Sequence, residues 1–227
     1  CAVVGNSGAL LYRQYGVDID AHAVVYRFNQ APVEGYERHV GARTTMESLN
    51  SAWMKQLLEA PRSAGRWNWR KPETALVIFE MFDPASMKFK TRDQIAMKDK
   101  WWKKSYERLR ARHPDKSVVV LSPRFMAWAT ALYARLKLRF QKLGLGVYSG
   151  EKPMSGFYAI LWTLQVCDRV DLYGFTPYRD EDRTEALATR YHYFDSAVPR
   201  AHSHSFDLTS HIYKLLAHRF HHFNIYD

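Results

Sequence analysis

Short apolar runs alternate with longer amphipathic stretches along most of this chain. Each run has the length of a strand and carries few charges, as do strands that are buried on both faces of a parallel sheet. The runs lie at Ala2–Val4, Val24–Phe28, Met46–Leu49, Ala75–Glu80, Ser117–Ser122 and Val170–Phe175. Because strands and helices alternate without internal repeats, the pattern predicts an α/β fold with a doubly wound, mostly parallel central sheet flanked by helices.

The segments between these runs carry apolar residues at helical spacing. We expect helices at Ala9–Tyr15, Ser51–Ala60, Trp101–His113, Pro123–Leu143 and Met154–Cys167. Gly16 is expected to end the first of them, as glycine does at many helix C-termini. Two other segments show little periodicity: we expect Pro61–Pro72 to be a basic connection and Phe82–Lys100 to be a mobile loop.

Glycine and polar residues follow the first two predicted strands. Gly5 and Gly8 bracket a turn after the first strand, and Asn29 comes directly after the second. Ligands of open parallel sheets bind at the carboxyl ends of the strands, and glycine turns expose N–H groups that can meet anionic oxygens. A Gly-x-x-Gly turn more often only ends a strand and binds nothing. By itself the pattern therefore indicates a phosphate or ribose site without identifying it.

Composition and charge bound the class of protein. With 227 residues, 47% of them hydrophobic, the chain is long enough for one well-buried core and short for two, so we expect a single domain over residues 1–227. It has no apolar run long enough to span a membrane. The net charge of +10 favours an anionic partner. Because Lys and Arg are scattered and no nucleic-acid-binding signature is present, we expect a small anionic molecule and no nucleic acid.

Four segments carry polar and aromatic residues in a distinctive order. They are the first fifty residues, which open Cys1-Ala-Val-Val-Gly5-Asn6-Ser7-Gly8, then Pro153–Phe175, then His192-Tyr193-Phe194-Asp195, and finally His202 with Phe206 and Asp207. In order and spacing they resemble the large, small, third and very small motifs of the eukaryotic sialyltransferase family, glycosyltransferase family 29. Chance does not account for four collinear matches.

This resemblance implies a variant GT-A fold and an inverting, single-displacement transfer of sialic acid from CMP-sialic acid to a glycan hydroxyl. The partners it implies are a CMP-sugar donor and an acceptor glycan on a glycoprotein, glycolipid or polysaccharide. The resemblance is weakest between Ser51 and Tyr148, where acceptor contacts usually arise in the family, and we place the expected loop at Phe82–Lys100 on the acceptor side. Linkage and acceptor are therefore not readable from the sequence.

Such a transfer needs a general base for the acceptor hydroxyl and a partner for the departing phosphate, and histidine suits both tasks. The resemblance makes His202 the catalytic base and His192 the phosphate partner. The family usually has Glu where this chain has Asp207, which keeps the carboxylate but shortens it. His204 is a competing candidate for the base, and the spacing to Phe206 and Asp207 favours His202.

The resemblance also assigns the donor site. Asn6 and Asn29 fall at positions that hydrogen-bond the nucleotide and its phosphate, with Ser7 beside Asn6. Ser155 and Gly156 fall near the ribose and the donor carboxylate, and they can form a helix N-cap at the same time. Some family members have another asparagine where this chain has Ala9, so one polar contact is missing from the pattern.

The two cysteines, Cys1 and Cys167, lie at positions that form a disulfide in the family. Two buried free thiols are the alternative. A disulfide would indicate an oxidising lumen. The family implies the Golgi lumen and the catalytic domain of a type II membrane protein, with membrane contact only through an anchor outside this chain.

Two patterns imitate metal sites. Asp18-Ile-Asp20 resembles the Asp-x-Asp motif of other glycosyltransferases, and His202 and His204 with Asp207 imitate zinc ligands. A monophosphate donor has less need of a metal, and the sialyltransferase family works without one. We therefore expect no metal and no cofactor.

Three alternatives to this function differ in how well they fit. The same fold could use another donor, such as CMP-Kdo or a different activated sugar, because the motifs recognise mostly the nucleotide. A non-catalytic nucleotide- or glycan-binding relative is the second alternative, favoured by Asp207 and Ala9 and opposed by His192 and His202. A dinucleotide-dependent oxidoreductase fails because the chain lacks the Gly-x-Gly-x-x-Gly turn.

Overall fold

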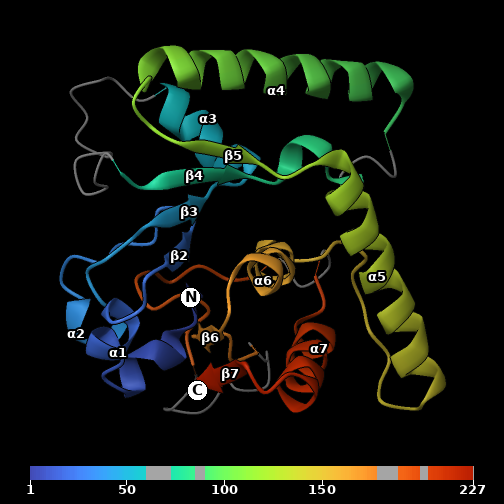
Figure 1. Ribbon diagram of the computed structural model, residues 1–227. Helices are drawn as coiled ribbons and strands as arrows, with labels where there is room; N and C mark the ends of the chain where they lie inside the picture. The colour runs from blue at the N-terminus through green and yellow to red at the C-terminus, as the bar shows by residue number, and fades with distance from the viewer. Residues whose placement is uncertain (60–72, 85–89, 178–188, 200–203, 227) are drawn as a thin grey trace.

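The computed structural model describes residues 1–59, 73–84, 90–177, 189–199 and 204–226, and Figure 1 shows their arrangement. Within these ranges, seven strands form one parallel sheet. The strands are β1 (Ala2–Val4), β2 (Val25–Phe28), β3 (Met46–Ser48), β4 (Ala75–Ile78), β5 (Val118–Val120), β6 (Val170–Tyr173) and β7 (Phe223–Tyr226). The α/β class with a parallel central sheet is therefore confirmed.

The strand order is β5-β4-β3-β2-β1-β6-β7, and each neighbouring pair is parallel. The chain builds outward from β1 to β5 and then crosses back to add β6 and β7 on the other side of β1. The order thus reverses between β1 and β6, where open α/β sheets bind their ligands. We did not predict β7, and β5 is a half-buried edge strand where we expected a buried one.

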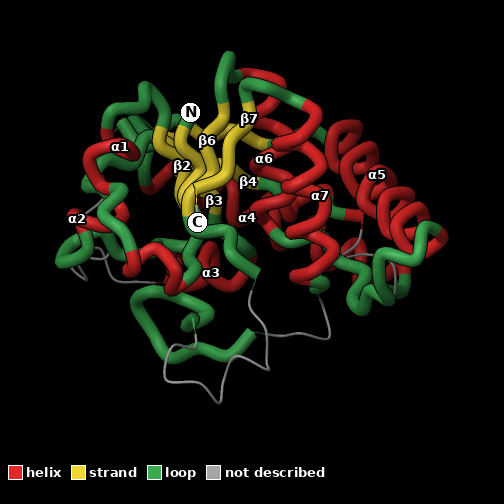
Figure 2. Tube along the Cα trace, turned by 90° about the horizontal axis from the view of Figure 1, so that it is seen from below, coloured by secondary structure: helices red, strands yellow, loops and turns green. Residues whose placement is uncertain are grey.

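Helices cover both faces of this sheet (Figures 1 and 2). The α-helices are α1 (Gly16–Asp20), α2 (Glu37–Val40), α3 (Ser51–Glu59), α4 (Arg92–Arg112), α5 (Pro123–Lys142), α6 (Ser155–Val166) and α7 (Phe206–Arg219), and the 3-10 helices are η1 (Gly8–Tyr12) and η2 (Glu80–Phe82). Val3 and Tyr26 pack toward α5, α6 and α7, whereas Val4 and Val25 pack toward η1, α1 and α2. On that second face, Leu76 of β4 packs against α3 and α4.

The first expected helix is wrong in its bounds. In place of a helix over Ala9–Tyr15, the chain forms η1, and Gly16 begins α1 rather than ending a helix. The Ser7 hydroxyl accepts the N–H of Ala9 and so starts η1 directly after the turn. The position of Gly16 has no room for a side chain. A Cβ there would collide with the carbonyl oxygen of Glu37, where α1 packs against α2.

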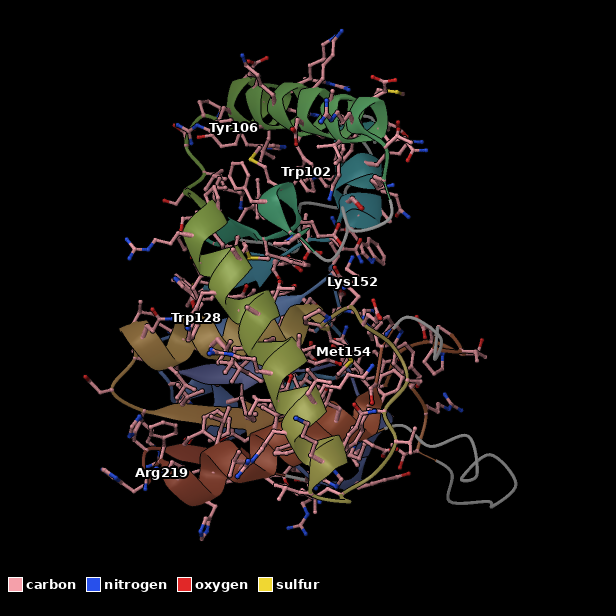
Figure 3. All side chains as sticks on the ribbon, turned by 90° about the vertical axis from the view of Figure 1, so that its right-hand side faces the viewer. Trp102, Tyr106, Trp128, Lys152, Met154 and Arg219 are labelled. Carbon is pink, nitrogen blue, oxygen red and sulfur yellow. A yellow bond between two sulfur atoms is a disulfide. The ribbon has the colours of Figure 1, made fainter. Side chains whose placement is uncertain are left out.

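The expected mobile loop at Phe82–Lys100 is also wrong over much of its length, because α4 begins at Arg92. Thr91 and Gln94 form a capping box that fixes this start, with the Thr91 hydroxyl accepting the Gln94 N–H at 3.3 Å. Trp102 lies on the side of α4 that faces α3 and β4 (Figure 3). Residues 85–89 and the whole of the expected connection at Pro61–Pro72 lie outside the described ranges.

Cys1 and Cys167 form a disulfide with a Cα–Cα distance of 6.1 Å, so the predicted pairing is confirmed. The bond ties the residue before β1 to the residue after α6. It therefore fixes the strand and the helix that flank the point where the strand order reverses. None of the helices within the described ranges combines the length and the apolar character needed to cross a bilayer.

Candidate active site

Two glycines bring the ends of β1 and β6 into close contact. The N–H of Gly5 donates to the carbonyl of Tyr173 at 2.7 Å, and a Cβ on Gly5 would collide with the carbonyl oxygen of Gly174. Gly174 itself has a φ of 70°, in the left-handed region that favours glycine. The backbone of the two turns is therefore tightly packed at the point where the strand order reverses.

A cavity of about 210 Å³ opens above these turns. Its lining includes all the described residues that we predicted for donor and phosphate binding, namely Asn6, Ser7, Asn29, Ser155, Gly156 and His192. They come from the ends of β1 and β2, the start of α6 and the segment before α7. The structure thus brings these residues together, while the role of each one stays a prediction.

The two asparagines present polar groups to this cavity in different ways. The Oδ1 atom of Asn6 is buried and has no hydrogen-bond partner within the described part of the chain. Asn29 has a left-handed φ of 55°, and its Oδ1 accepts the N–H of Asn50 at 3.0 Å. Asn6 therefore offers an acceptor to a ligand, and the Asn29 amide NH2 is the group that remains to act as a donor.

The N-termini of α6 and α7 both contribute to the cavity lining. Ser155 is the first residue of α6 and not its N-cap, which is Met154, so the N-cap interpretation of Ser155 is wrong. Ser205 caps α7 through its hydroxyl, which accepts the N–H of Leu208 at 3.3 Å. Since helix N-termini carry partial positive charge, their convergence suits an anionic ligand.

His192 is held firmly at the edge of the cavity. Its Nδ1 donates to the carboxylate of Asp195 at 2.9 Å, and the ring stacks between Tyr191 and Phe194 with centroid distances of 4.3 and 5.0 Å. The neighbouring N–H of Tyr193 donates to the Asn6 carbonyl at 2.9 Å. With Nδ1 engaged, Nε2 is the ring atom that can meet a ligand.

His204 lines the same cavity. Its Nδ1 donates to the backbone carbonyl of Lys152 at 2.8 Å, and burial lowers the pKa of the imidazole below its ordinary value. The ring is therefore neutral at pH 7, with an unprotonated Nε2. His202, the predicted base, lies outside the described residues, so its position is not part of this geometry.

The Asp-x-Asp pattern has a structural use. Asp20 accepts the N–H groups of Ala42 and Arg43 at 2.8 and 2.9 Å, and it does not line the cavity. Within the described ranges, no three His, Cys, Asp or Glu side chains gather as metal ligands would. The second pattern includes His202 and so lies partly outside these ranges, and the expectation of a metal-free site stays a prediction.

Sequence reasoning did not identify Tyr213 as a residue of the site. Tyr213 lies on α7 and is 2% exposed, and its hydroxyl has no hydrogen-bond partner among the described residues. A Cβ built on Gly156 would lie 3.4 Å from this hydroxyl, which places it beside the start of α6. The N-cap Ser205 and the apolar spacing of Leu208 and Ile212 were signals for α7 that we did not use.

Comparison with known proteins matches residues 1–220 to the family model described as glycosyltransferase family 29 (sialyltransferase). A beta-galactoside alpha-2,6-sialyltransferase 2 from Takifugu rubripes is 34% identical over 202 residues, which are 87% of this chain and 34% of the relative. A mouse beta-galactoside alpha-2,6-sialyltransferase 1 is 28% identical over 197 residues, 87% of this chain and 45% of the relative. The chain thus spans between a third and a half of these relatives.

A solved structure agrees with these matches. It is a mammalian sialyltransferase in complex with Gal-beta-1-3GalNAc-ortho-nitrophenol, and it superposes with a TM-score of 0.58 at 26% identity. The similarity covers the whole of this chain and 68% of the solved one.

Proposed function

Because the chain belongs to glycosyltransferase family 29, the sialyltransferases, we propose that it transfers sialic acid from CMP-sialic acid to a hydroxyl of an acceptor glycan. The observation that carries this proposal is the convergence of three sequence motifs on one cavity. Asn6 and Asn29 of the large motif, Ser155 of the small motif and His192 of the third motif all line it. The cavity also lies where the strand order reverses, as a nucleotide site in a parallel sheet does.

The polar groups of the cavity match the parts of a CMP-sugar. The Asn6 acceptor and the Asn29 donor suit the nucleotide, whose base and ribose present both kinds of group. The N-termini of α6 and α7 and the Tyr213 hydroxyl suit the phosphate and the carboxylate of the donor. Burial raises the pKa of Tyr213 well above its ordinary value, so this hydroxyl remains a hydrogen-bond donor at neutral pH.

The proposed reaction is one displacement at the anomeric carbon. The acceptor oxygen forms a bond to this carbon as the bond to the phosphate oxygen of CMP breaks, which inverts the configuration. His202 takes the proton of the acceptor hydroxyl, and His192 partners the charge that develops on the departing CMP through Nε2. Because CMP leaves as a monophosphate, this scheme uses no metal and no cofactor.

We infer an acceptor glycan that ends in β-linked galactose, on a glycoprotein, glycolipid or polysaccharide. The relatives are named as beta-galactoside sialyltransferases, and the solved neighbour holds Gal-beta-1-3GalNAc-ortho-nitrophenol. A terminal β-galactose is common to both. The hydroxyl that is modified follows from neither.

The disulfide between Cys1 and Cys167 supports a compartment in which disulfides persist. We propose the Golgi lumen, with the chain as the catalytic part of a type II membrane protein.

The direct experiment supplies the purified protein with CMP-sialic acid and β-galactoside acceptors in the presence of a metal chelator. We expect a sialylated product of inverted configuration and release of CMP. CMP-Kdo in a parallel reaction tests the closest alternative donor. Transfer from CMP-Kdo alone, or CMP binding without turnover of either donor, would contradict the proposal, and activity that requires added manganese would contradict its metal-free form.

A further inference from the structure

Lys152 and His204 are joined by a hydrogen bond that fixes the direction in which the imidazole can act. A backbone carbonyl can only accept, so the Nδ1 of His204 must be the donor to the Lys152 oxygen at 2.8 Å. The proton of a neutral ring is then on Nδ1, and Nε2 carries a lone pair. Since His204 lines the cavity, it supplies an acceptor to whatever occupies that part of the site.

Lys152, labelled in Figure 3, is itself held by charged side chains. Its Nζ lies 2.8 Å from Glu80 and 3.6 Å from Asp83, both of which are buried. Glu80 also accepts the N–H of Ser51 at 2.6 Å, and Asp83 accepts the hydroxyl of Tyr158 at 2.9 Å. The segment that orients His204 is therefore connected to the start of α3, the turn after β4 and the first turn of α6.

The charges around His204 act on its pKa in opposite directions. Burial is the main cause of its lowered pKa, and the Lys152 ammonium lowers it further, while the hydrogen bond to the Lys152 carbonyl and the carboxylates of Glu80 and Asp83 raise it. Burial alone would also raise the pKa of Glu80, but the ion pair with Lys152 and the Ser51 N–H hold it below its usual range. His192 and Tyr191 line the same cavity, and burial raises the pKa of Tyr191, so its hydroxyl is neutral.

We propose that His204 binds the acceptor glycan, with its Nε2 accepting a hydrogen bond from a sugar hydroxyl, and that Lys152 is the positioning residue that orients it. This inference rests on the proposed sialyltransferase function. The phosphate and carboxylate of the donor carry only acceptor oxygens, so a neutral imidazole with a free lone pair cannot serve them. A sugar hydroxyl supplies the missing hydrogen. The hydroxyls of the donor have the same chemistry, and the kinetic test separates the two sources.

Two substitutions at His204 distinguish the contributions of its two ring nitrogens. The amide of Asn reaches the position of Nδ1 and keeps the contact with the Lys152 carbonyl, whereas the amide of Gln reaches the position of Nε2 and keeps an acceptor in the cavity. We expect His204→Asn to raise the KM for the acceptor glycan about fivefold to tenfold, as the loss of one hydrogen bond does. His204→Gln should stay closer to wild type, and both should affect the acceptor KM more than the donor KM.

An unchanged acceptor KM in His204→Asn would overturn the proposal, and a change confined to the donor KM would assign the hydroxyl to the donor and overturn it as well. These outcomes require a wild-type enzyme that turns over CMP-sialic acid. A wild type without turnover contradicts the proposed function, which is a different result. In that case the tautomer of the His204 imidazole can still be measured, and it tests the hydrogen bond on which the inference depends.

The geometry can be tested by nitrogen-15 NMR of the histidine side chains, with the His204 signal assigned by its loss in His204→Gln. We expect the neutral ring to carry its proton on Nδ1 at about pH 8, where an ordinary imidazole is also neutral. Lys152→Met should release this tautomer, and Lys152→Arg should preserve it. A neutral ring protonated on Nε2 in wild type would overturn the positioning role.

Discussion

The N–H of Tyr193 donates to the carbonyl of Asn6 at 2.9 Å, joining two residues from nearly opposite ends of the chain. Two residues after Asn6, the N–H of Gly8 donates to the carbonyl of Arg190, which lies three residues before Tyr193. His192 lies between these two attachment points, so its distance from the turn after β1 is set by backbone bonds rather than by its own side chain. The backbone on either side of His192 is consequently joined to the turn that carries the donor-site asparagine.

The contact between the two glycine turns predicts a severe effect of Gly5→Ala. Its Cβ would collide with the Gly174 carbonyl, which no rotamer can relieve, so we expect CMP affinity to be lost or the protein not to fold. Gly35→Ala is the control, because Gly35 has a φ of 81° and no atom within 4 Å of an added Cβ. The control should lower the free energy of unfolding by only about 1 kcal/mol and leave CMP binding intact, as measured by calorimetry. Equal effects of both substitutions would contradict the close contact.

The Tyr213 hydroxyl predicts a selective loss of donor affinity. Tyr213→Phe removes one oxygen that has no partner among the described residues, so the fold should persist while the KM for CMP-sialic acid rises about tenfold. Tyr133→Phe is the matched control, since the Tyr133 hydroxyl is also buried but does not line the cavity. Steady-state kinetics at fixed acceptor concentration make the comparison. A Tyr213→Phe enzyme with a wild-type donor KM would remove Tyr213 from the site.

Replacement of Cys1 and Cys167 by serine should destabilise the protein substantially. The disulfide joins residues 166 positions apart, and closing so long a loop restricts the unfolded chain by an amount worth about 3–5 kcal/mol. Urea unfolding of the double variant should show a correspondingly lower midpoint, and wild type with added reductant should approach it. A reduced wild type that remains as stable as the oxidised form would show that the bond does not contribute.

The ion pair between Glu80 and Lys152 predicts a dependence of stability on pH. The pKa of Glu80 is lower in the folded protein than its usual value of 4.5, so its stabilisation is complete above about pH 5 and is lost as the pH falls through the folded pKa. The pKa of Lys152 is raised, so its contribution is lost only above about pH 10. Glu80→Gln should therefore cost about 3 kcal/mol at pH 7 and flatten the acid limb of the stability curve.

The exposed pair of Lys55 and Glu59 supplies the control for this prediction. Their atoms lie 3.9 Å apart in water, so Glu59→Gln should change the free energy of unfolding by less than about 0.5 kcal/mol at any pH. Urea unfolding between about pH 3 and 8 compares the two variants. If both substitutions lowered the free energy of unfolding by similar small amounts, the buried pair would contribute no more to stability than the exposed one.

Local signals in the sequence predicted the strands well and the connections between distant segments poorly. The apolar run Ala2–Val4 and the turn at Gly5 suffice to predict a strand and a ligand-binding edge, because both depend on neighbouring residues. The start of α4 at Arg92 was also encoded locally, in the capping box of Thr91 and Gln94, but its polar surface hid the helical period.

The parts of the site that escaped prediction depend on long-range packing. Gly16 has no room for a side chain because α2 packs against it, and the role of Lys152 in orienting His204 depends on Glu80, far away in the sequence. A residue pattern cannot reveal which carbonyl lies beside a ring nitrogen. The motif match identified His192, Asn6 and Asn29, which line the cavity, whereas no local sequence signal identifies Tyr213.

The measurement that tests the central claim most directly is turnover of CMP-sialic acid, without metal, by wild type and by His202→Ala. We predict that wild type releases CMP and sialylates a β-galactoside acceptor, and that the variant binds CMP with unchanged affinity but loses at least about a hundredfold in kcat, as the loss of a general base implies. A variant that binds CMP and turns over at the wild-type rate would contradict the assignment of His202 as the base. A folded wild type that fails to bind CMP would contradict the account as a whole.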